Sequence, residues 1–163
     1  MHPFVIWLCG LVPGTIIETD DCVTITHTGE VAGTPTTSTL WKRRPEVSLP
    51  PHLGPVETFY RHFDGADLFS SAFKIASLTE SKFSGTVPIV GSISDLIEAL
   101  ASAGVAFPEP STPFMDGSGQ WVYAVGHNTG CIHEWDSEVG ELSDEYPTVE
   151  IIIQEWVAAV IEQ

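Results

Sequence analysis

Three residues in the C-terminal half of the sequence could do chemistry together: His127, Cys131 and His133. Thiolate and imidazole are zinc ligands, and Asp136 or a water molecule could complete a tetrahedral site. The spacing of the three residues, however, matches no standard zinc motif. A thiol nucleophile would need a general base within hydrogen-bonding distance and an oxyanion hole, and the sequence indicates neither. We therefore predict no catalytic residue, no metal and no cofactor. A small hydrolase or metal-dependent enzyme that uses these three residues is the alternative.

Paired carboxylates are the second feature with chemical potential, because two facing acids can hydrolyse a glycosidic bond. Such a site needs a sugar cleft between the acids and a raised pKa on one of them. Solvated acids on loops explain the pairs in this sequence more simply. The pairs are Asp64 and Asp67, Asp116 and Asp136, and Glu134 and Glu138. The sequence also contains no phosphate-binding loop, no glycine motif for dinucleotides and no nucleophile elbow.

Charge is distributed unevenly along the chain. Its 163 residues include 22 Asp and Glu against 6 Lys and Arg, which gives a formal net charge of -16 at pH 7. No Lys or Arg follows Lys82, whereas 13 acids do, from Asp95 to Glu162. A polyanionic surface repels nucleic-acid phosphates and anionic membranes, and it attracts basic proteins in a salt-dependent way. We therefore expect a basic protein partner, no nucleic acid and no membrane. Solubility is the alternative role for the acids.

Length and composition are typical of a single globular domain. Hydrophobic residues make up 43% of the chain and 5 Trp are present, which excludes a disordered protein. The 3 cysteines are an odd number at irregular spacing, so the sequence indicates no disulfide framework and favours a reducing cytoplasm. The apolar run 4–12 lacks the basic flank of a secretory signal and is too short to span a bilayer. We expect it to be a core strand.

A β-hairpin over residues 120–136 should organise the rest of the chain. Trp121, Tyr123 and Val125 alternate with smaller residues, as in a strand. The turn at 127–130 contains Asn and Gly, which tolerate a positive φ angle. The alternation then resumes up to Trp135, after which we expect an acidic loop. The hairpin should therefore lie near the centre of a sheet.

Other elements follow from periodicity and from turn residues. Helices are predicted near 55–63, 92–103 and 148–161, because apolar residues recur three and four positions apart. The first should end at Asp64-Gly65, where Gly supplies a left-handed cap, and the second should carry a capping box of Ser92 and Asp95. Residues 1–40 read as a β-rich N-terminal extension without a long helix. The expected strands are 72–78 and 86–90, and the expected loops are 29–39, 66–69 and 107–113.

A series of short motifs follows in order along the chain: Leu49-Pro50, FYRHFDG at 59–65, FKIASLTE at 73–80, DGSG at 116–119, WVYA at 121–124, GCIHEWD at 130–136 and the closing helix. This ordered set resembles the SUKH superfamily, whose founding members are fungal cell-wall-synthesis regulators. The resemblance covers residues 49–163, whereas family members usually open with a helix where this chain has the β-like residues 1–40. It implies an α+β domain with a mostly antiparallel sheet and helices packed around it. It also implies non-enzymatic work, since many bacterial members look like immunity proteins that neutralise a toxin, often a nuclease.

We place the partner-binding surface on acids that could pair with Lys and Arg of a basic partner. Six acids lie among residues 134–145, and Trp135 would be an aromatic anchor if it is exposed, with burial in the core as the alternative. The predicted function is a cytoplasmic, non-enzymatic immunity protein against a basic, nuclease-type toxin. A housekeeping scaffold is a third reading, and the sequence leaves the oligomeric state open. The predicted site residues are Asp64, Asp67, Asp116, Trp135, Asp136, Glu138, Glu141, Asp144 and Glu145.

Overall fold

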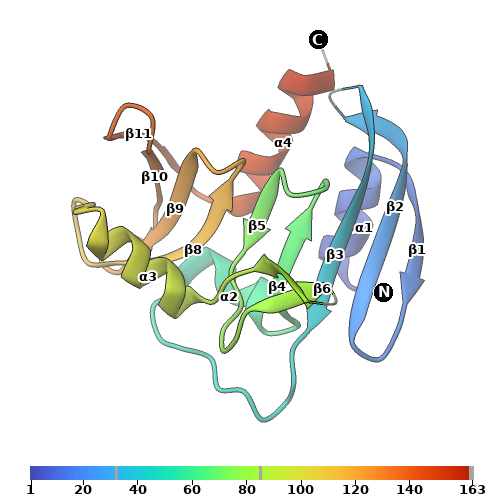
Figure 1. Ribbon diagram of the computed structural model, residues 1–163, viewed down its shortest axis with the longest axis horizontal. Helices are drawn as coiled ribbons and strands as arrows, with labels where there is room; N and C mark the ends of the chain where they lie inside the picture. Colours follow the sequence, from blue (N-terminus) through green and yellow to red (C-terminus); the bar gives the residue numbers. More distant parts are fainter. Residues whose placement is uncertain (32, 85, 162–163) are drawn as a thin grey trace.

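The computed structural model describes residues 1–31, 33–84 and 86–161 and is built on a nine-stranded antiparallel sheet (Figure 1). All neighbouring strands of this sheet are consecutive in the sequence except β5 and β8. The predicted α+β class with a mostly antiparallel sheet is therefore confirmed. In sheet order the strands are β1 (Gly14–Glu18), β2 (Cys22–Val31), β3 (Thr34–Lys42), β4 (Phe63–Leu68), β5 (Phe73–Ile75), β8 (Ser111–Gly117), β9 (Trp121–Gly126), β10 (Ile132–Asp136) and β11 (Glu141–Tyr146).

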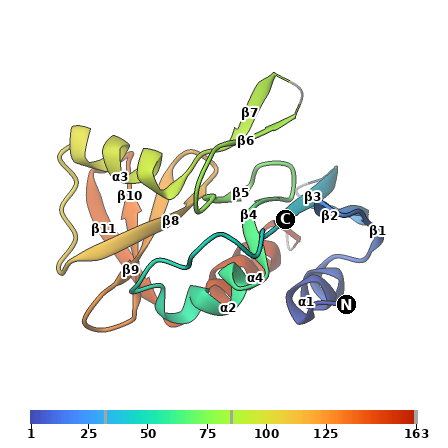
Figure 2. The ribbon, with the colours of Figure 1, turned by 90° about the horizontal axis from the view of Figure 1, so that it is seen from below.

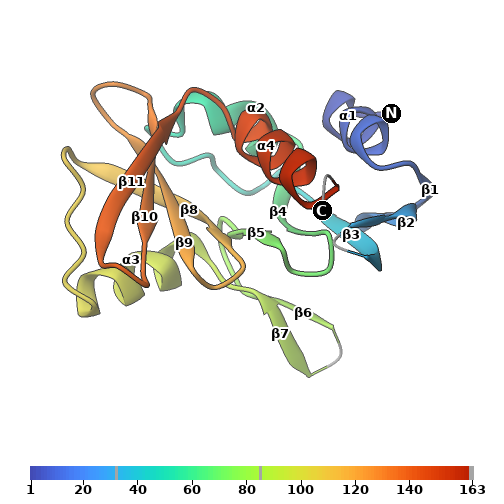
Figure 3. The same ribbon diagram turned by 90° about the horizontal axis from the view of Figure 1, so that it is seen from above.

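Helices cover both faces of the sheet. Figures 2 and 3 show α1, α2 and α4 on one face, and α3 with a separate two-stranded sheet on the other. The two-stranded sheet pairs β6 with β7 and is inserted, together with α3, between β5 and β8. The bounds are α1 (Pro3–Leu11), the 3-10 turn η1 (Gly54–Val56), α2 (Glu57–Tyr60), β6 (Lys82–Ser84), β7 (Val87–Val90), α3 (Ile93–Ser102) and α4 (Val149–Ile161).

The hairpin predicted for 120–136 is formed by β9 and β10. Its register pairs Val125 with Ile132 and Tyr123 with Glu134. Side chains alternate between the two faces of a strand, so Tyr123 and Val125 point to the face covered by α4 and both are buried. The hairpin lies toward one end of the sheet, because only β11 lies beyond it.

The closing helix α4 contacts both β11 and β2, so it bridges the two ends of the sheet. Its buried residues are Val149, Ile152, Ile153 and Val157, and full burial of each large apolar side chain stabilises the fold by about 1.5–3 kcal/mol. Helix α3 begins at the predicted capping box: Asp95 N donates to Ser92 Oγ at 3.1 Å, and Ser92 N donates to Asp95 Oδ2 at 3.2 Å. None of the described helices is long and apolar enough to cross a bilayer.

The N-terminal segment differs from its prediction in two places. Residues 4–12 were expected to form a strand, but α1 occupies them and buries Phe4, Val5 and Leu8. Of the expected loop at 29–39, residues 29–31 belong instead to β2 and residues 34–39 to β3, and these strands pair along most of their length. Threonine is β-branched and favours strands, and this outweighs the Gly and Pro of the segment. Because β3 pairs with β4, strands β1, β2 and β3 lie in the same sheet as β4.

Four further local predictions are wrong. The first helix does not end at Asp64-Gly65, because β4 already begins at Phe63, and β4 also includes residues 66–68 of the expected loop 66–69. The expected loop 107–113 contains the start of β8, whose Pro113 lies beside a bulge, a position where a strand tolerates proline. The expected acidic loop after β10 contains β11, which is an outermost strand of the sheet. Charged residues are common on edge strands because they prevent pairing with other chains.

Candidate functional site

Five of the predicted site residues come together on the β10–β11 hairpin, and we call this group the acidic edge. Glu138, Glu141, Asp144 and Glu145 are exposed, and Asp136 is half-buried. Among the described residues, no Lys or Arg forms an ion pair with any of the five; their one ionic contact joins Glu145 Oε1 to His133 Nδ1 at 3.3 Å. The acidic edge therefore carries negative charge that the chain itself does not neutralise.

Asp64 was also predicted to bind the partner, but the structure buries it and does not place it on this surface. The residue is only 3% exposed. Its carboxylate accepts hydrogen bonds from Leu78 N at 2.6 Å and Ser77 Oγ at 3.1 Å, and it pairs with Lys82 Nζ at 2.9 Å. Buried carboxylates need such partners because desolvation of an isolated charge is costly. Asp64 therefore ties β4 to the start of the β6–β7 segment.

Asp67 and Asp116 are half-buried and lie on either side of Lys74 in the register of β4, β5 and β8. Burial raises the pKa of Asp116, and the nearby Lys74 ammonium opposes that shift. Asp67 accepts hydrogen bonds from Ser71 N at 2.6 Å and Ser71 Oγ at 3.0 Å. Lys74 thus lies between these two acids in the sheet register, whereas no Lys or Arg of the described residues pairs with the acidic edge.

Trp135 is half-buried and points away from the face that α4 covers. It pairs with Val122 and Leu142, whereas its neighbour Glu134 pairs with Tyr123 on the α4 face. Successive side chains of a strand point to opposite faces. Trp135 therefore cannot act as an aromatic anchor on the α4 side of the acidic edge.

A cavity of about 430 Å³ lies on that α4 side, between the β9–β11 strands and the first half of α4. Five aromatic residues line it, and so do four acids, two of which belong to the acidic edge. No Lys, Arg or His is among its lining residues. The aromatic residues are Phe73, Trp121, Tyr123, Tyr146 and Trp156, and the acids are Glu134, Asp136, Asp144 and Glu155.

The centre of this cavity combines a buried carboxylate with two phenols. Glu134 is only 7% exposed and accepts a hydrogen bond from Ser143 Oγ. Burial raises the pKa of Tyr146 to about 12, and the Glu134 carboxylate adds to the shift. Burial and Glu134 likewise raise the pKa of Tyr123. Both phenols therefore stay neutral at neutral pH, and Tyr123 and Tyr146 pack edge to face with ring centroids 6.3 Å apart.

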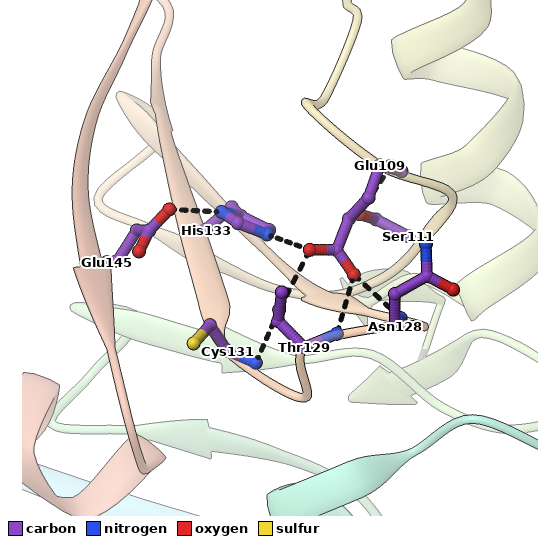
Figure 4. Close-up of polar contacts among 7 residues, drawn as sticks. All are labelled: Glu109, Ser111, Asn128, Thr129, Cys131, His133 and Glu145. Carbon is purple, nitrogen blue, oxygen red and sulfur yellow. Dashed lines mark hydrogen bonds and ion pairs between the residues drawn. The ribbon is translucent and has the colours of Figure 1, made fainter.

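A second polar cluster holds the turn between β9 and β10 (Figure 4). Glu109 Oε1 accepts hydrogen bonds from Asn128 N at 2.7 Å and Thr129 N at 3.0 Å, and Oε2 accepts from Thr129 Oγ1 at 2.8 Å. His133 Nε2 lies 3.3 Å from Glu109 Oε2, so its imidazole sits between two carboxylates, those of Glu109 and Glu145. A side chain at Gly126 would collide with this carboxylate, since its Cβ would lie 2.3 Å from Glu109 Oε1.

The structure does not assemble the three residues that could have formed a metal or thiol site. His127 Nε2 is 2.8 Å from Thr112 Oγ1, and its ring stacks on His52 at 4.3 Å. His133 is held by Glu109, and the Cys131 sulfur points away from it in Figure 4. No group of three or more His, Cys, Asp or Glu side chains within 1–31, 33–84 and 86–161 has metal-binding geometry.

The ionised Glu109 carboxylate should make the stability of the fold sensitive to acid. Its hydrogen bonds, led by that from the Thr129 amide, lower its pKa from the usual 4.5 to about 2. A depressed folded-state pKa stabilises the protein above the unfolded-state value, and this contribution is lost as the pH falls through the folded-state value. Glu109→Gln should therefore unfold at lower urea concentration than wild type at pH 7, and the difference should shrink between about pH 4.5 and 2.

The measurement is a series of urea midpoints from pH 7 to pH 2. Glu98→Gln, at an exposed position of α3, is the matched control and should follow wild type throughout. A Glu109→Gln difference that stays constant with pH would contradict the assignment of acid lability to this carboxylate.

Sequence reasoning missed both the cavity and Glu109. The alternation of β9 correctly put Trp121 and Tyr123 on one face, but Trp156 comes from α4, for which the sequence predicted only a helix. Tyr146 and Ser143 lie in a segment read as a loop. Nothing in the sequence around Glu109 signalled its role, because the backbone amides that it binds belong to a turn almost 20 residues away.

Comparison with known proteins found no matching family model, no matching curated protein and no matching solved structure. The SUKH resemblance therefore stays a prediction, and the functional argument rests on the geometry and charge of the chain.

Proposed function

We propose that this protein is a non-enzymatic binding module of the SUKH type, an immunity protein that neutralises a basic, nuclease-type toxin. The observation that carries the proposal is the acidic edge: five carboxylates on one hairpin without an ion pair to Lys or Arg among the described residues. Surface acids that serve only solubility are normally interspersed with bases. A one-sign patch instead steers an oppositely charged protein toward itself.

The location of the acids supports the same proposal. Ion pairs to Lys or Arg in the described chain lie elsewhere, with Lys42 to Glu18, Arg61 to Glu57 and Lys82 to Asp64. The positive charge is therefore concentrated on the other half of the protein, and the charge asymmetry orients an approaching partner. A nuclease presents a cationic groove to nucleic-acid phosphates, and an anionic hairpin is complementary to such a groove.

Neutralising the acidic edge tests this proposal. The variant Glu138→Gln, Glu141→Gln, Asp144→Asn, Glu145→Gln should fail to capture a basic protein from a lysate of the native organism. The matched control is Asp20→Asn, Glu30→Gln, Glu46→Gln, Glu80→Gln, which removes the same charge from exposed positions of the other half. Wild type and control should both capture the partner, because both keep the acidic edge. The control loses as much charge as the edge variant, so a difference between the two variants reports the position of the charge.

Association rates measured with the captured protein then distinguish electrostatic steering by the acidic edge from the effect of total net charge. At low salt the edge variant should associate at least about tenfold more slowly than the control, and its rate should depend less on salt. Equal association rates for the edge variant and the control would contradict the proposal. Cleavage of nucleic acid by the captured protein, and its inhibition by wild type, would identify the partner as a nuclease.

A further inference from the structure

We propose that the cavity beside the acidic edge binds the guanidinium group of an arginine side chain presented by the partner. This inference rests on the proposed function, because it names the group that a basic partner inserts. The cavity adjoins the acidic edge directly, since Asp136 and Asp144 belong to both. An arginine that entered it would lie beside these two edge carboxylates. The cavity would thereby supply the anchor that Trp135 cannot provide.

The aromatic lining favours an organic cation. Trp and Tyr rings attract a cation placed over their faces, and the cavity brings four of them together from β9, β11 and α4. Trp156 also packs edge to face on Phe73 at 5.3 Å, which fixes its orientation. The volume of the cavity, about 430 Å³, lies within the range of small-ligand sites, roughly 300–1,000 Å³.

The buried carboxylate is an independent observation that points to a cation. Glu134 is only 7% exposed, and the groups that hydrogen-bond to it are neutral: the hydroxyl of Ser143 and the phenols of Tyr123 and Tyr146. Elsewhere in the described chain, the comparably buried Asp64 is paired with an ammonium group. A buried carboxylate without a cation is costly, and an opposite charge in the same site recovers part of that cost. An incoming guanidinium would give Glu134 such a cationic partner.

Arginine fits this lining better than a metal ion or a lysine. No described group of three or more His, Cys, Asp or Glu has the geometry of a metal site. A guanidinium is planar, stacks on aromatic rings and donates two parallel hydrogen bonds to one carboxylate. An ammonium is compact and strongly hydrated, so it loses more on entering an aromatic cavity.

The test uses the five tryptophans as reporters. Trp121 and Trp156 line the cavity, Trp135 points to the opposite face, and Trp7 and Trp41 lie in the N-terminal part. Their indole N–H signals in a ¹H–¹⁵N NMR spectrum can be assigned with single Trp→Phe variants. The ligand is N-acetyl-arginine methylamide, titrated into the full chain. The neutral isostere N-acetyl-citrulline methylamide and the lysine analogue are titrated in parallel.

Blocked arginine should shift the indole signals of Trp121 and Trp156 saturably, with a dissociation constant on the order of millimolar, the weakest class of specific affinity. The other three indole signals should stay in place. Citrulline should bind at least about tenfold more weakly, because it lacks the charge that cation–π and ionic contacts need. Asp144→Asn should weaken arginine binding about fivefold, whereas Glu138→Gln, an equal charge change outside the cavity lining, should not.

Equal binding of citrulline, tighter binding of lysine or shifts confined to Trp135 would each overturn the inference, as would the absence of saturable shifts. These failures are distinguishable from failure of the proposed function. If the acidic edge captures its basic partner but blocked arginine does not bind, only the arginine pocket is lost. If arginine binds but the edge variant associates as fast as its control, the steering role of the edge is lost instead.

Discussion

Asp64→Ala is expected to lower the free energy of unfolding by about 3–5 kcal/mol, the usual cost of removing one partner from a buried ion pair. The Asp64 side chain is 5% exposed and that of Lys82 is 16% exposed, so neither group is well hydrated. The substitution also removes the acceptor of the Leu78 amide and of the Ser77 hydroxyl. Because small domains are stable by only about 5–15 kcal/mol, much of the native population should be lost near physiological temperature.

Urea denaturation measures this effect, and two further variants interpret it. Asp67→Ala, only three residues away, removes a half-buried carboxylate that bonds to Ser71 alone and should cost much less. A double-mutant cycle with Lys82→Ala should give a coupling energy of at least about 1 kcal/mol, since the two side chains share one contact. A loss below about 1 kcal/mol for Asp64→Ala would show that the buried pair is not a stabilising link.

The second large effect is expected at Ile153, which is fully buried where α4 packs on the sheet. Ile153→Ala should cost about 2–5 kcal/mol, because it removes apolar contacts and leaves a cavity that the surrounding residues fill only in part. The position also supports the ligand cavity, since α4 supplies its Trp156 and Glu155 walls. We therefore expect the Trp156 indole signal to broaden or shift in this variant even without ligand.

Gln154→Ala is the matched control. It changes the next residue of the same helix, but its side chain is exposed, and alanine is a better helix former than glutamine. Its thermal midpoint should be equal to that of wild type or slightly higher. Similar destabilisation by both substitutions would contradict the assignment of Ile153 to the core.

The elements that the sequence predicted correctly have strong local signals. The capping box of Ser92 and Asp95 fixes the start of α3, and both of its hydrogen bonds are present. Alternation from Trp121 to Val125 identifies β9, and the apolar stripe of α4 is long enough to exclude a strand. In each case the information lies within one segment, so no knowledge of tertiary contacts was needed.

The elements that were missed depend on contacts that the local sequence does not contain. Residues 3–11 are apolar nearly all round, and such a short run does not distinguish a helix from a buried strand. The usable signals were small: Pro3 occupies the first turn, and His2 Nδ1 accepts from Phe4 N at 3.1 Å as a cap. Gly65, read as a helix cap, has φ +92° inside β4, where a Cβ would lie 3.0 Å from Ile75 O.

The candidate site was predictable in charge but not in shape. The sequence correctly located exposed acids on the segment after β10, because charge density needs no fold to be recognised. It could not distinguish the buried Asp64 from the exposed acids, because the Asp64 partners Ser77 and Lys82 come from later segments. It also could not place Trp156 and Trp121 in the same cavity, because that arrangement depends on where α4 crosses the sheet. A site assembled from distant segments becomes visible only in three dimensions.

The separation of β5 from β8 has a consequence for synthesis on the ribosome. Every other strand of the large sheet can pair with its predecessor as soon as it leaves the exit tunnel, but β5 waits for β8 until the intervening 35 residues (76–110) have been translated. During that interval the nascent sheet has an open edge, which is a hazard for association with other chains. Because β5 has only three residues, the open edge presents few unpaired backbone N–H and C=O groups with which another chain could pair.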